Sequence, residues 1–449
     1  MEKKKILIRA GCSPFEYLTV KEVSDDNLFG NNVGNLLYAY SIFRWLMTDE
    51  NVELVPDRYR PERGLCSDAD IDRINQEYDR YIVPMADTFR KSFEENLRIY
   101  TQFIRKLTIP VIVIGVGISG GLEPDAPVNC VPDAVVKEFL NAVLDHSAIV
   151  GLRGEHTCML LEKLGYQEGK HITPIGCPSL YTYGERLKLS DPDIAGDRRL
   201  ILTNNIFANT PVHRFIRRTA QEHPEFFFIP QRVEELRMYY SGRDMDLKTF
   251  PDNRKQYPVS LQDPFFVKGH TAFPMNIPGW MKLTKGSGMA VGPRLHGSVV
   301  SMLTGVPALL IRKDWRTTEV GEYHHIPMIS QFSVTDKTRL EELAGQFDFH
   351  APEKVHKENL KHYRDFLAAN AVANIYGSRA MNAGGAAGSA ADAGADGSAA
   401  GQDCVFDRRI RQAKLAVPVL PYNHISRLEQ IRRNHPHPGQ EIAGKLFRK

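Results

Sequence analysis

The stretch Met289-Ala-Val-Gly-Pro-Arg-Leu-His-Gly-Ser298 joins a short apolar run to a turn with glycine and proline, and then to a helical pattern. Because the apolar run 289–291 ends at a glycine, it is typical of a buried strand. The turn places Arg294 and His296 at the carboxyl end of that strand, before a helix that we expect to start near Gly297. Strand, turn and helix in this order indicate an α/β chain.

The same succession recurs along the sequence. Further short runs rich in β-branched or aromatic residues are expected strands, at 5–9, 111–114, 148–152, 199–202, 226–229 and 308–311. Helical patterns alternate with them, at 36–47, 133–144, 157–164, 212–222, 297–303 and 339–347. Continuous apolar strands are typical of parallel sheets that are covered on both faces. The chain is therefore expected to form parallel sheets with right-handed helical crossovers.

A polar, turn-rich stretch at 190–197 interrupts this alternation and marks an expected boundary between two lobes of similar size. We expect an N-terminal Rossmann-like lobe over 1–189 and a C-terminal Rossmann-like lobe over 198–350. A helix over 351–376 is expected to pack back on the lobes. Ligands of such sheets meet the carboxyl ends of the strands, so the binding site is expected in a central cleft.

The last part of the chain differs in composition. Residues 383–402 are almost entirely Ala, Gly, Ser and Asp, which cannot bury enough apolar surface to fold, so we expect a flexible linker. Residues 403–449 form a basic tail with 10 Lys or Arg against 4 Asp or Glu, within a chain that has 57 and 54 in total. This tail is expected to be a solvated appendage or a surface-docked arm, and contact with an anionic membrane surface stays open. The near balance of charge gives no reason to expect a nucleic-acid partner.

The six cysteines are scattered singly and lack the spacing of a zinc site or a disulfide framework, so reduced thiols are expected. No histidine or acidic motif predicts a metal site, and no cofactor is expected. The apolar run near the start is too short for a signal peptide. The longest apolar run, 109–118, is about half of the ~20 residues that cross a membrane. We expect a cytoplasmic protein, with peripheral binding at the inner membrane face as an open alternative.

Arg294 and His296 are the first candidates for chemistry. The amino end of the expected helix at Gly297 and Ser298 presents unpaired N–H groups, which suit an anion. The Arg294 guanidinium suits a carboxylate or phosphate, and His296 can move a proton near neutral pH. The alternative is that both side chains only bond to backbone carbonyls.

Arg153 follows the expected strand 148–152 and is another cation at a strand end, for which a surface salt bridge is the competing interpretation. Thr157 is the expected N-cap of the next helix. None of the glycine-rich turns has the spacing of a dinucleotide-binding or P-loop motif. The other candidates lie in three further turns: Asn32, Gly34 and Asn35 in the turn 29–35, Gly117 after the strand 111–114, and Asp314 and Arg316 after the strand 308–311. The Asp314 carboxylate either orients an acceptor hydroxyl or caps the following helix.

Seven motifs, taken together and in this order, resemble the polysaccharide pyruvyl transferase family. They are Gly30-Asn-Asn-Val-Gly-Asn35, Ile114-Gly-Val-Gly-Ile118, Gly151-Leu-Arg-Gly-Glu155, Gly176-Cys-Pro-Ser179, Gly292-Pro-Arg-Leu-His-Gly-Ser298, Gly305-Val-Pro307 and Asp314-Trp-Arg316. The resemblance runs from about 25 to about 330, and its most specific element is the Arg-Leu-His-Gly turn. It implies a two-lobed fold like that of GT-B glycosyltransferases. It also implies transfer of a pyruvyl group from phosphoenolpyruvate onto a sugar as a ketal, without metal or nucleotide cofactor.

The resemblance also implies roles for individual residues. Arg294 and Arg153 correspond to arginines that hold the donor, and His296 corresponds to the histidine of the same turn, the expected general acid. Leu295, Gly297 and Ser298 complete that motif in the set of expected binding residues, while Asp314 is the second expected catalytic residue. The sequence departs from the family pattern at Gly154, where many members have Asp, and in the turn 29–35, which has Asn where many have Asp.

Two other functions stay open at this point. The same two-lobed scaffold suits a glycosyltransferase that uses a nucleotide sugar, since fold does not fix function. A non-enzymatic glycan- or anion-binding adaptor, tethered through 383–401, is the third. The expected partners of the favoured function are phosphoenolpyruvate as the donor and a glycan or lipid-linked oligosaccharide as the acceptor.

Overall fold

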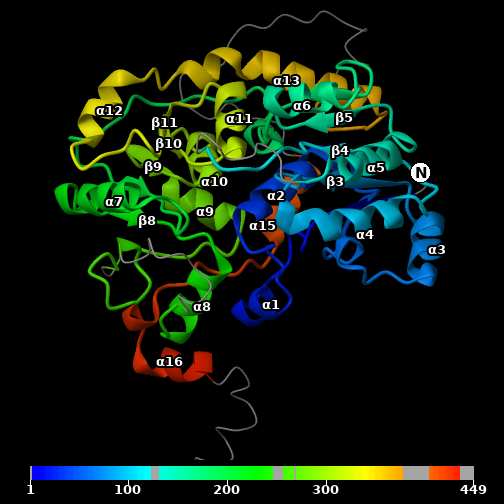
Figure 1. Ribbon diagram of the computed structural model, residues 1–449. Coiled ribbons are helices and arrows are strands. Elements are labelled where there is room, and N and C mark those ends of the chain that lie inside the picture. Colours follow the sequence, from blue (N-terminus) through cyan, green and yellow to red (C-terminus); the bar gives the residue numbers. More distant parts are fainter. Residues whose placement is uncertain (1–2, 123–130, 246–255, 267–268, 378–403, 435–449) are drawn as a thin grey trace, which may run out of the picture.

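The computed structural model describes residues 3–122, 131–245, 256–266, 269–377 and 404–434. Its strands form parallel sheets covered by helices, in an N-terminal lobe (blue and cyan in Figure 1) and a C-terminal lobe (green and yellow). The N-terminal sheet has the order β2-β1-β3-β4, with β1 at Lys4–Ile8, β2 at Val52–Pro56, β3 at Arg80–Pro84 and β4 at Val111–Ile114. Beside it lie β5 (Val150–Leu152) and β6 (Ile172–Pro174), which pair with each other. The α/β fold class expected from the sequence is confirmed.

The C-terminal sheet has five parallel strands in the order β11-β10-β9-β7-β8. They are β7 at Leu200–Leu202, β8 at Phe226–Phe228, β9 at Met289–Gly292, β10 at Ala308–Arg312 and β11 at Met328–Ser330. β7 and β8 have no exposed residue, in keeping with their continuous apolar sequences. Such strands are covered on both faces, as Figure 1 shows for the helices around this sheet.

Fifteen α-helices are described. In the N-terminal lobe they are α1 (Val20–Asp25), α2 (Gly34–Leu46), α3 (Asp68–Glu77), α4 (Glu94–Ile104), α5 (Asp133–Leu144) and α6 (Glu155–Lys163). In the C-terminal lobe they are α7 (Thr210–Glu222), α8 (Val233–Ser241), α9 (Ile277–Thr284), α10 (Leu295–Leu303), α11 (Trp315–Tyr323) and α12 (Leu340–Gln346). The last three are α13 (Ala351–Ala369), α15 (Val405–Gln412) and α16 (Arg427–Asn434).

Two expected helix starts were wrong. α10 begins at Leu295 instead of near Gly297, with Arg294 as its N-cap, so the backbone N–H of Ser298 already bonds to the Arg294 carbonyl. α6 begins at Glu155 with Gly154 as its N-cap, and Thr157 lies inside its first turn. In both cases the turn between strand and helix is shorter than the sequence suggested, because the polar residues of the motif are themselves helical.

α13 packs on both lobes, along the top of Figure 1. Its Asn359 side chain donates to the carbonyl of Tyr323 at the end of α11, at 2.7 Å. Near its other end, Asn370 donates to the Ile149 carbonyl beside β5, at 3.0 Å. The expected helix 351–376 therefore exists, although it ends at Ala369.

Residues 404–434, which we name the C-terminal strap, also contact both lobes. Phe406 is fully buried and packs on Tyr40 of α2 with ring centroids 4.8 Å apart, which contributes roughly 1.5–3 kcal/mol. Farther along, Val419 exchanges two backbone hydrogen bonds with Phe273 of the C-terminal lobe, at 2.8 and 2.9 Å. This part of the expected basic tail is thus a docked arm. The expected linker 383–402 and the end of the tail, 435–449, lie outside the described residues.

The two lobes also meet at a buried carboxylate. Glu319 of α11 accepts the backbone N–H of Thr157, at 2.6 Å, and the Thr157 hydroxyl, at 3.0 Å. The acidic side chain of one lobe therefore caps the first turn of α6 in the other. Burial raises the pKa of the Glu319 carboxyl to about 7, although both hydrogen bonds lower it.

This pKa predicts a pH dependence of stability. Between the ordinary value of 4.5 and about 7, the folded chain keeps a proton on Glu319 that the unfolded chain releases. The free energy of unfolding therefore falls as the pH rises through this window. Glu319→Gln does not ionise; its amide oxygen can accept the Thr157 N–H, and its amide N–H can donate to the Thr157 hydroxyl. Its stability relative to the wild type should therefore rise by about 2–3 kcal/mol from pH 5 to pH 8. Denaturant unfolding at both pH values checks this, and a difference that does not change with pH would contradict it.

Candidate active site

Each sheet contains one point at which the strand order reverses. In the N-terminal lobe the chain passes from β1 to β2 on one side and returns as β3 on the other. In the C-terminal lobe it passes from β7 to β8 and returns as β9. The loops at the carboxyl ends of such neighbouring strands run in opposite directions and leave a crevice, which is where open α/β sheets bind ligands.

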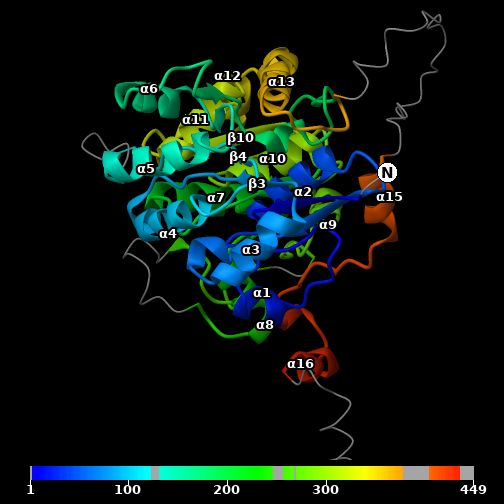
Figure 2. The same cartoon turned by 90° about the vertical axis from the view of Figure 1, so that its right-hand side faces the viewer.

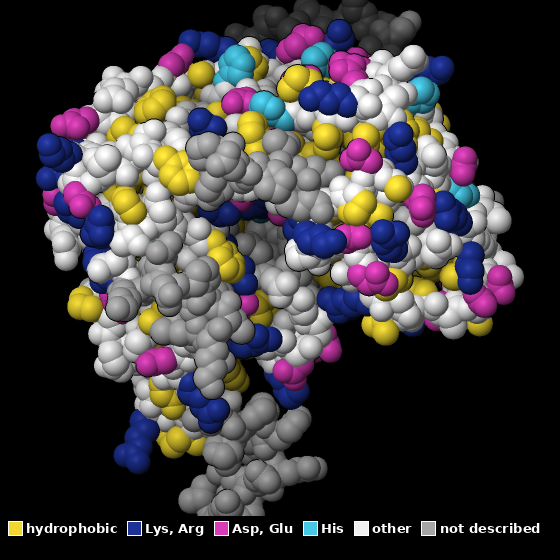
Figure 3. Space-filling model, in the orientation of Figure 1, with side chains coloured by type: hydrophobic (Ala, Val, Ile, Leu, Met, Phe, Trp, Pro, Cys, Tyr) yellow, Lys and Arg dark blue, Asp and Glu magenta, His cyan; other side chains and the backbone are white. Residues whose placement is uncertain are grey.

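A cleft of about 670 Å³ lies at these strand ends, between the two lobes. Its walls include Arg9 after β1, Asp87 after β3, Asn205 after β7 and Arg294 after β9. Figure 3 shows the cleft as a hollow with basic side chains around it. The charged side chains that line it are Arg9, Arg63, Arg90, Arg232, Arg294, Lys313 and Arg316 against Glu62, Asp87 and Asp314. The excess of cations makes the cleft a site for an anion.

Arg294 is held from two sides. Its Nε donates to the backbone carbonyl of Asn204 at 2.7 Å, and its Nη2 lies 3.7 Å from a carboxylate oxygen of Glu235. The side chain is 95% buried, yet Nη2 has no hydrogen-bond partner among the described residues. A buried donor without a partner costs about 1–3 kcal/mol, so the fold keeps this N–H oriented at the expense of stability.

His296 lies in the first turn of α10 and lines the same cleft. Its ring packs against the start of α2 so closely that a Cβ at Gly34 would lie 2.2 Å from Nδ1, which explains the glycine there. Within the described parts of the chain, Nε2 has no hydrogen-bond partner. Burial, helped by the charges of Arg153 and Arg316, lowers the pKa of His296 well below its ordinary value of 6.5. The imidazole is therefore neutral at pH 7.

Arg316 and Asp314 form the third corner of the cleft. The Asp314 carboxylate accepts the backbone N–H of Thr317 at 2.8 Å and so caps α11, as one of the two interpretations of this residue predicted. Burial alone would raise the pKa of Asp314, but the charges of Lys313 and Arg316 lower it well below its ordinary range. The carboxylate is thus ionised and lies 3.7 Å from Arg316 Nη2. The Nε of Arg316 is buried without a hydrogen-bond partner in the described ranges.

Arg153, in contrast, does not line the cleft, and it forms no surface salt bridge. It is only 1% exposed and donates to the carbonyls of Gly115 at 3.1 Å and Met85 at 3.3 Å. Its guanidinium lies 5.1 Å from the ring centre of Tyr38, which does line the cleft. Arg153 therefore acts on the cleft through its charge and through Tyr38.

The remaining expected residues divide into two groups. Asn32 and Asn35 lie in the cleft wall, at the start of α2. The others are buried around it without lining it: Leu295, Gly297, Ser298, Gly34 and Gly117. A Cβ at Gly297 would lie 2.8 Å from Thr203 Cγ2, and one at Gly117 would lie 2.9 Å from Arg153 Cβ. These glycines allow close packing behind the site, and their expected role as direct ligand contacts stays a prediction.

The structure also explains one departure from the family pattern. At Gly154 a Cβ would lie 2.5 Å from Cγ of Glu319, the carboxylate that caps α6 from the other lobe. A larger residue at this position would collide with that contact between the lobes. The glycine at this position therefore leaves room for the contact of Glu319 with α6.

The sequence analysis did not single out several residues of the cleft. Some of them follow strands that were not predicted, and others lie far from the motifs. Arg9 pairs with Glu62 at 2.5 Å, and both line the cleft. Asp87 follows β3 and lies 3.2 Å from Arg90 and 3.8 Å from Arg316. Phe207, which is 47% exposed, stacks on Arg232 at 5.2 Å. Recognition of Arg80–Pro84 as a strand would have pointed to Asp87.

A single group of three potential metal ligands occurs in the described residues, Glu155, Cys158 and Glu168. None of them lines the cleft. Among the helices described here, none combines the length and the apolar character required to cross a membrane.

The chain was compared with solved structures and with curated proteins. Among solved structures, the UDP-GlcNAc 2-epimerase of Methanocaldococcus jannaschii is 11% identical, with a TM-score of 0.45, and the match covers 81% of this chain and 99% of that one. The UDP-GlcNAc 2-epimerase of Neisseria meningitidis is 12% identical, with a TM-score of 0.35 over 84% and 98% of the two chains. The glycosyltransferase SnogD of Streptomyces nogalater is 10% identical, with a TM-score of 0.33 over 80% and 96%. No curated protein matches the sequence.

The family comparison covers most of the cleft, although Arg9 and Arg316 lie outside the matched residues. The model described as "Polysaccharide pyruvyl transferase" matches residues 32–314. The match begins at Asn32 in one wall of the cleft, includes Arg294 and His296, and ends at Asp314 in the opposite wall. Because it spans more than half of the sequence, the chain belongs to the polysaccharide pyruvyl transferase family.

Proposed function

We propose that the chain transfers the pyruvyl group of phosphoenolpyruvate to two hydroxyls of a sugar, in a polysaccharide or its lipid-linked precursor, and releases phosphate. One observation carries this proposal for the donor. Arg294 Nη2, His296 Nε2 and Arg316 Nε are all buried without a hydrogen-bond partner among the described residues, and all three side chains line one cleft. Such groups are stabilised by an anion that accepts their hydrogen bonds.

Phosphoenolpyruvate matches this arrangement because it carries a carboxylate and a phosphate on one carbon. Two guanidinium groups can each bind one of these anions, and charge-assisted hydrogen bonds of this type contribute about 1.5–3 kcal/mol each. Asp314 has a positioning role, since its carboxylate lies beside Arg316 and is also fixed by the cap of α11. We therefore assign the binding of the donor to Arg294 and Arg316, and the positioning of Arg316 to Asp314.

His296 is the proposed acid. Burial and, to a lesser extent, the charges of Arg153 and Arg316 lower its pKa. Bound anions offset these charges and raise the pKa, so that the imidazole takes up a proton when the donor is present. Transfer of this proton to the methylene carbon makes carbon 2 electrophilic, and the first sugar hydroxyl adds there. The carbon–oxygen bond to phosphate then breaks, and the second hydroxyl closes the ketal. Of the two hydroxyl protons, one restores His296 and the other leaves with phosphate.

The rest of the cleft suits a sugar acceptor. Amide side chains provide donors and acceptors for hydroxyl groups, and those in the wall are Asn27, Asn31, Asn32, Asn35, Asn96 and Asn205. Phe207 adds a half-exposed aromatic ring at the same cleft. Apolar rings beside a few fixed polar groups are typical of small-molecule sites.

A first prediction concerns the donor. Phosphoenolpyruvate should raise the thermal unfolding midpoint of the full chain, since it binds only the folded state. Loss of one charge-assisted contact in Arg294→Ala should weaken this binding about 10- to 150-fold. Arg214→Ala is the matched control, because this arginine pairs with Asp336 on the surface and should leave the midpoint shift unchanged. A midpoint shift with nucleotide sugars but not with phosphoenolpyruvate would favour a glycosyltransferase instead.

A second prediction concerns the acid. His296→Ala should lower turnover by about 10²–10⁴-fold and change donor affinity little, because it removes proton transfer and leaves the arginines. Phosphate release from phosphoenolpyruvate in the presence of a panel of methyl hexosides measures this. His362→Ala, which replaces an exposed histidine of α13, serves as the control. Equal turnover in both variants would exclude His296 from the mechanism.

A further inference from the structure

The C-terminal strap is only half buried. Ala416 and Val419 face the body of the protein, whereas Val417 between them is 80% exposed and Leu420 is 40% exposed. In α16, Leu428 and Ile431 are 71% and 42% exposed. These two residues are three positions apart and therefore share one face of the helix. Some apolar side chains of the strap thus pack against the protein, and others are exposed to solvent.

This exposure is concentrated. Nine large apolar side chains are exposed in the described residues, and four of them lie on the strap, which makes up less than a tenth of those residues. Leu420 lies next to α16, since Arg433 donates to its carbonyl at 3.2 Å. α16 projects from the lower end of the molecule in Figures 1 and 2, and hydrophobic and basic side chains gather there in Figure 3. Soluble surfaces rarely group exposed apolar residues without a binding role.

The charge of the strap is positive, although Arg408 and Arg409 pair with Glu50 of the N-terminal lobe at 2.9 and 3.0 Å. Residues 404–434 contain seven Lys or Arg and only Asp407 and Glu429 as acids. Both acids are engaged: Asp407 pairs with Arg44 at 2.8 Å, and Glu429 accepts the Ser426 backbone N–H at 3.1 Å at the start of α16. Arg427, in contrast, is exposed beside Leu428.

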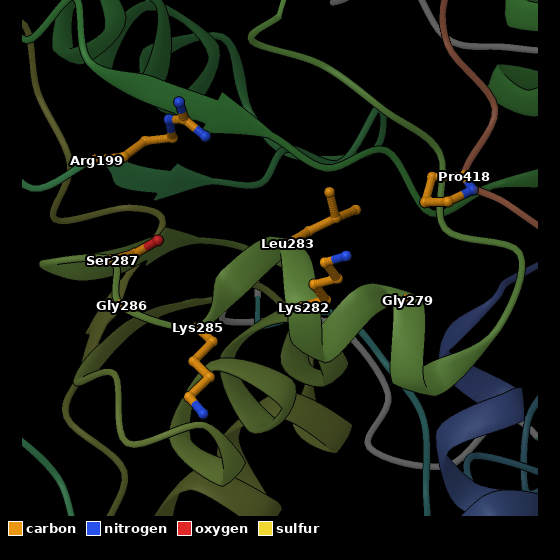
Figure 4. A pocket seen from close by; sticks show the side chains of 8 residues that line it. All are labelled: Arg199, Gly279, Lys282, Leu283, Lys285, Gly286, Ser287 and Pro418. Carbon is orange, nitrogen blue, oxygen red and sulfur yellow. The ribbon is translucent and has the colours of Figure 1, made fainter. Parts of the chain in front are cut away.

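A second basic surface adjoins the strap at Pro418. A cavity of about 490 Å³ there is lined by Arg199, Lys282 and Lys285 (Figure 4). None of these three forms an ion pair with the described part of the chain, and the Arg199 and Lys285 side chains point in different directions in Figure 4. They do not converge on one small anion. Instead, these three side chains add positive charge to the surface beside the strap.

We propose that the strap binds the surface of an anionic lipid membrane, with Leu420, Leu428 and Ile431 entering the interface. Exposed apolar residues beside an excess of arginine and lysine are typical of segments that lie in a membrane interface, where anionic headgroups attract the cations. A second copy of the chain fits less well, because a symmetric contact through this face would bring like charges together. Membrane binding itself does not depend on the proposed activity. Its consequence for a lipid-linked acceptor, which would be held near the cleft, rests on the proposed function.

Co-sedimentation of the full chain with vesicles tests this proposal. Binding is expected to vesicles that contain phosphatidylglycerol, with a clear loss on vesicles of phosphatidylcholine alone and at high salt. Leu428→Asp/Ile431→Asp should weaken binding at least about tenfold, since it replaces apolar contacts by repelled charges. Leu65→Asp/Met159→Asp, at residues that are 56% and 48% exposed elsewhere, is the matched control and should bind like the wild type.

Several results would overturn the proposal. One is that the chain does not bind anionic vesicles. Another is that it binds neutral vesicles as well as anionic ones. A third is that the Leu428→Asp/Ile431→Asp variant binds anionic vesicles as well as the wild type does. Light scattering gives a further test, because a dimer that becomes monomeric in Leu428→Asp/Ile431→Asp would identify this face as a self-contact. Phosphate release with soluble methyl hexosides should be unchanged in the strap variant, so failure of membrane binding and failure of the proposed activity are told apart.

Discussion

The contact between His296 and Gly34 determines the character of the cleft. His296 lies in the first turn of α10, after β9, and Gly34 begins α2 in the opposite lobe; a Cβ at Gly34 would collide with the imidazole. The contact desolvates the imidazole at the point where the strand order of both sheets reverses. Desolvation and nearby guanidinium charges together keep His296 neutral. A bound anion offsets the guanidinium charges while the desolvation stays, which links donor binding to the acid–base state of this side chain.

The other contacts between the lobes maintain this geometry. Glu319 caps α6 from the opposite lobe, and Asp314 holds Arg316 while it caps α11. α13 and the strap connect the lobes at places outside the cleft.

The sequence predicted the strands that are buried on both faces, such as β4 and β8, because they read as continuous apolar runs. It missed β2 and β11, which lie at sheet edges with partly exposed residues. It also missed β3, whose aliphatic run is only Ile82 and Val83, and β6, which has only three residues. Arg294, His296 and Arg316 were found because they sit in compact motifs. Arg153 was misplaced, since its burial depends on carbonyls at Met85 and Gly115 that only the folded chain brings together.

The most direct test of the central claim is the titration of His296 by NMR in ring-labelled protein, with His296→Gln to assign its signal. Without ligand its pKa should lie well below 6.5. Saturation with phosphoenolpyruvate should raise this pKa, because the bound anions offset the charges of the neighbouring arginines. A pKa that does not change when the donor binds would contradict an anion site beside this histidine.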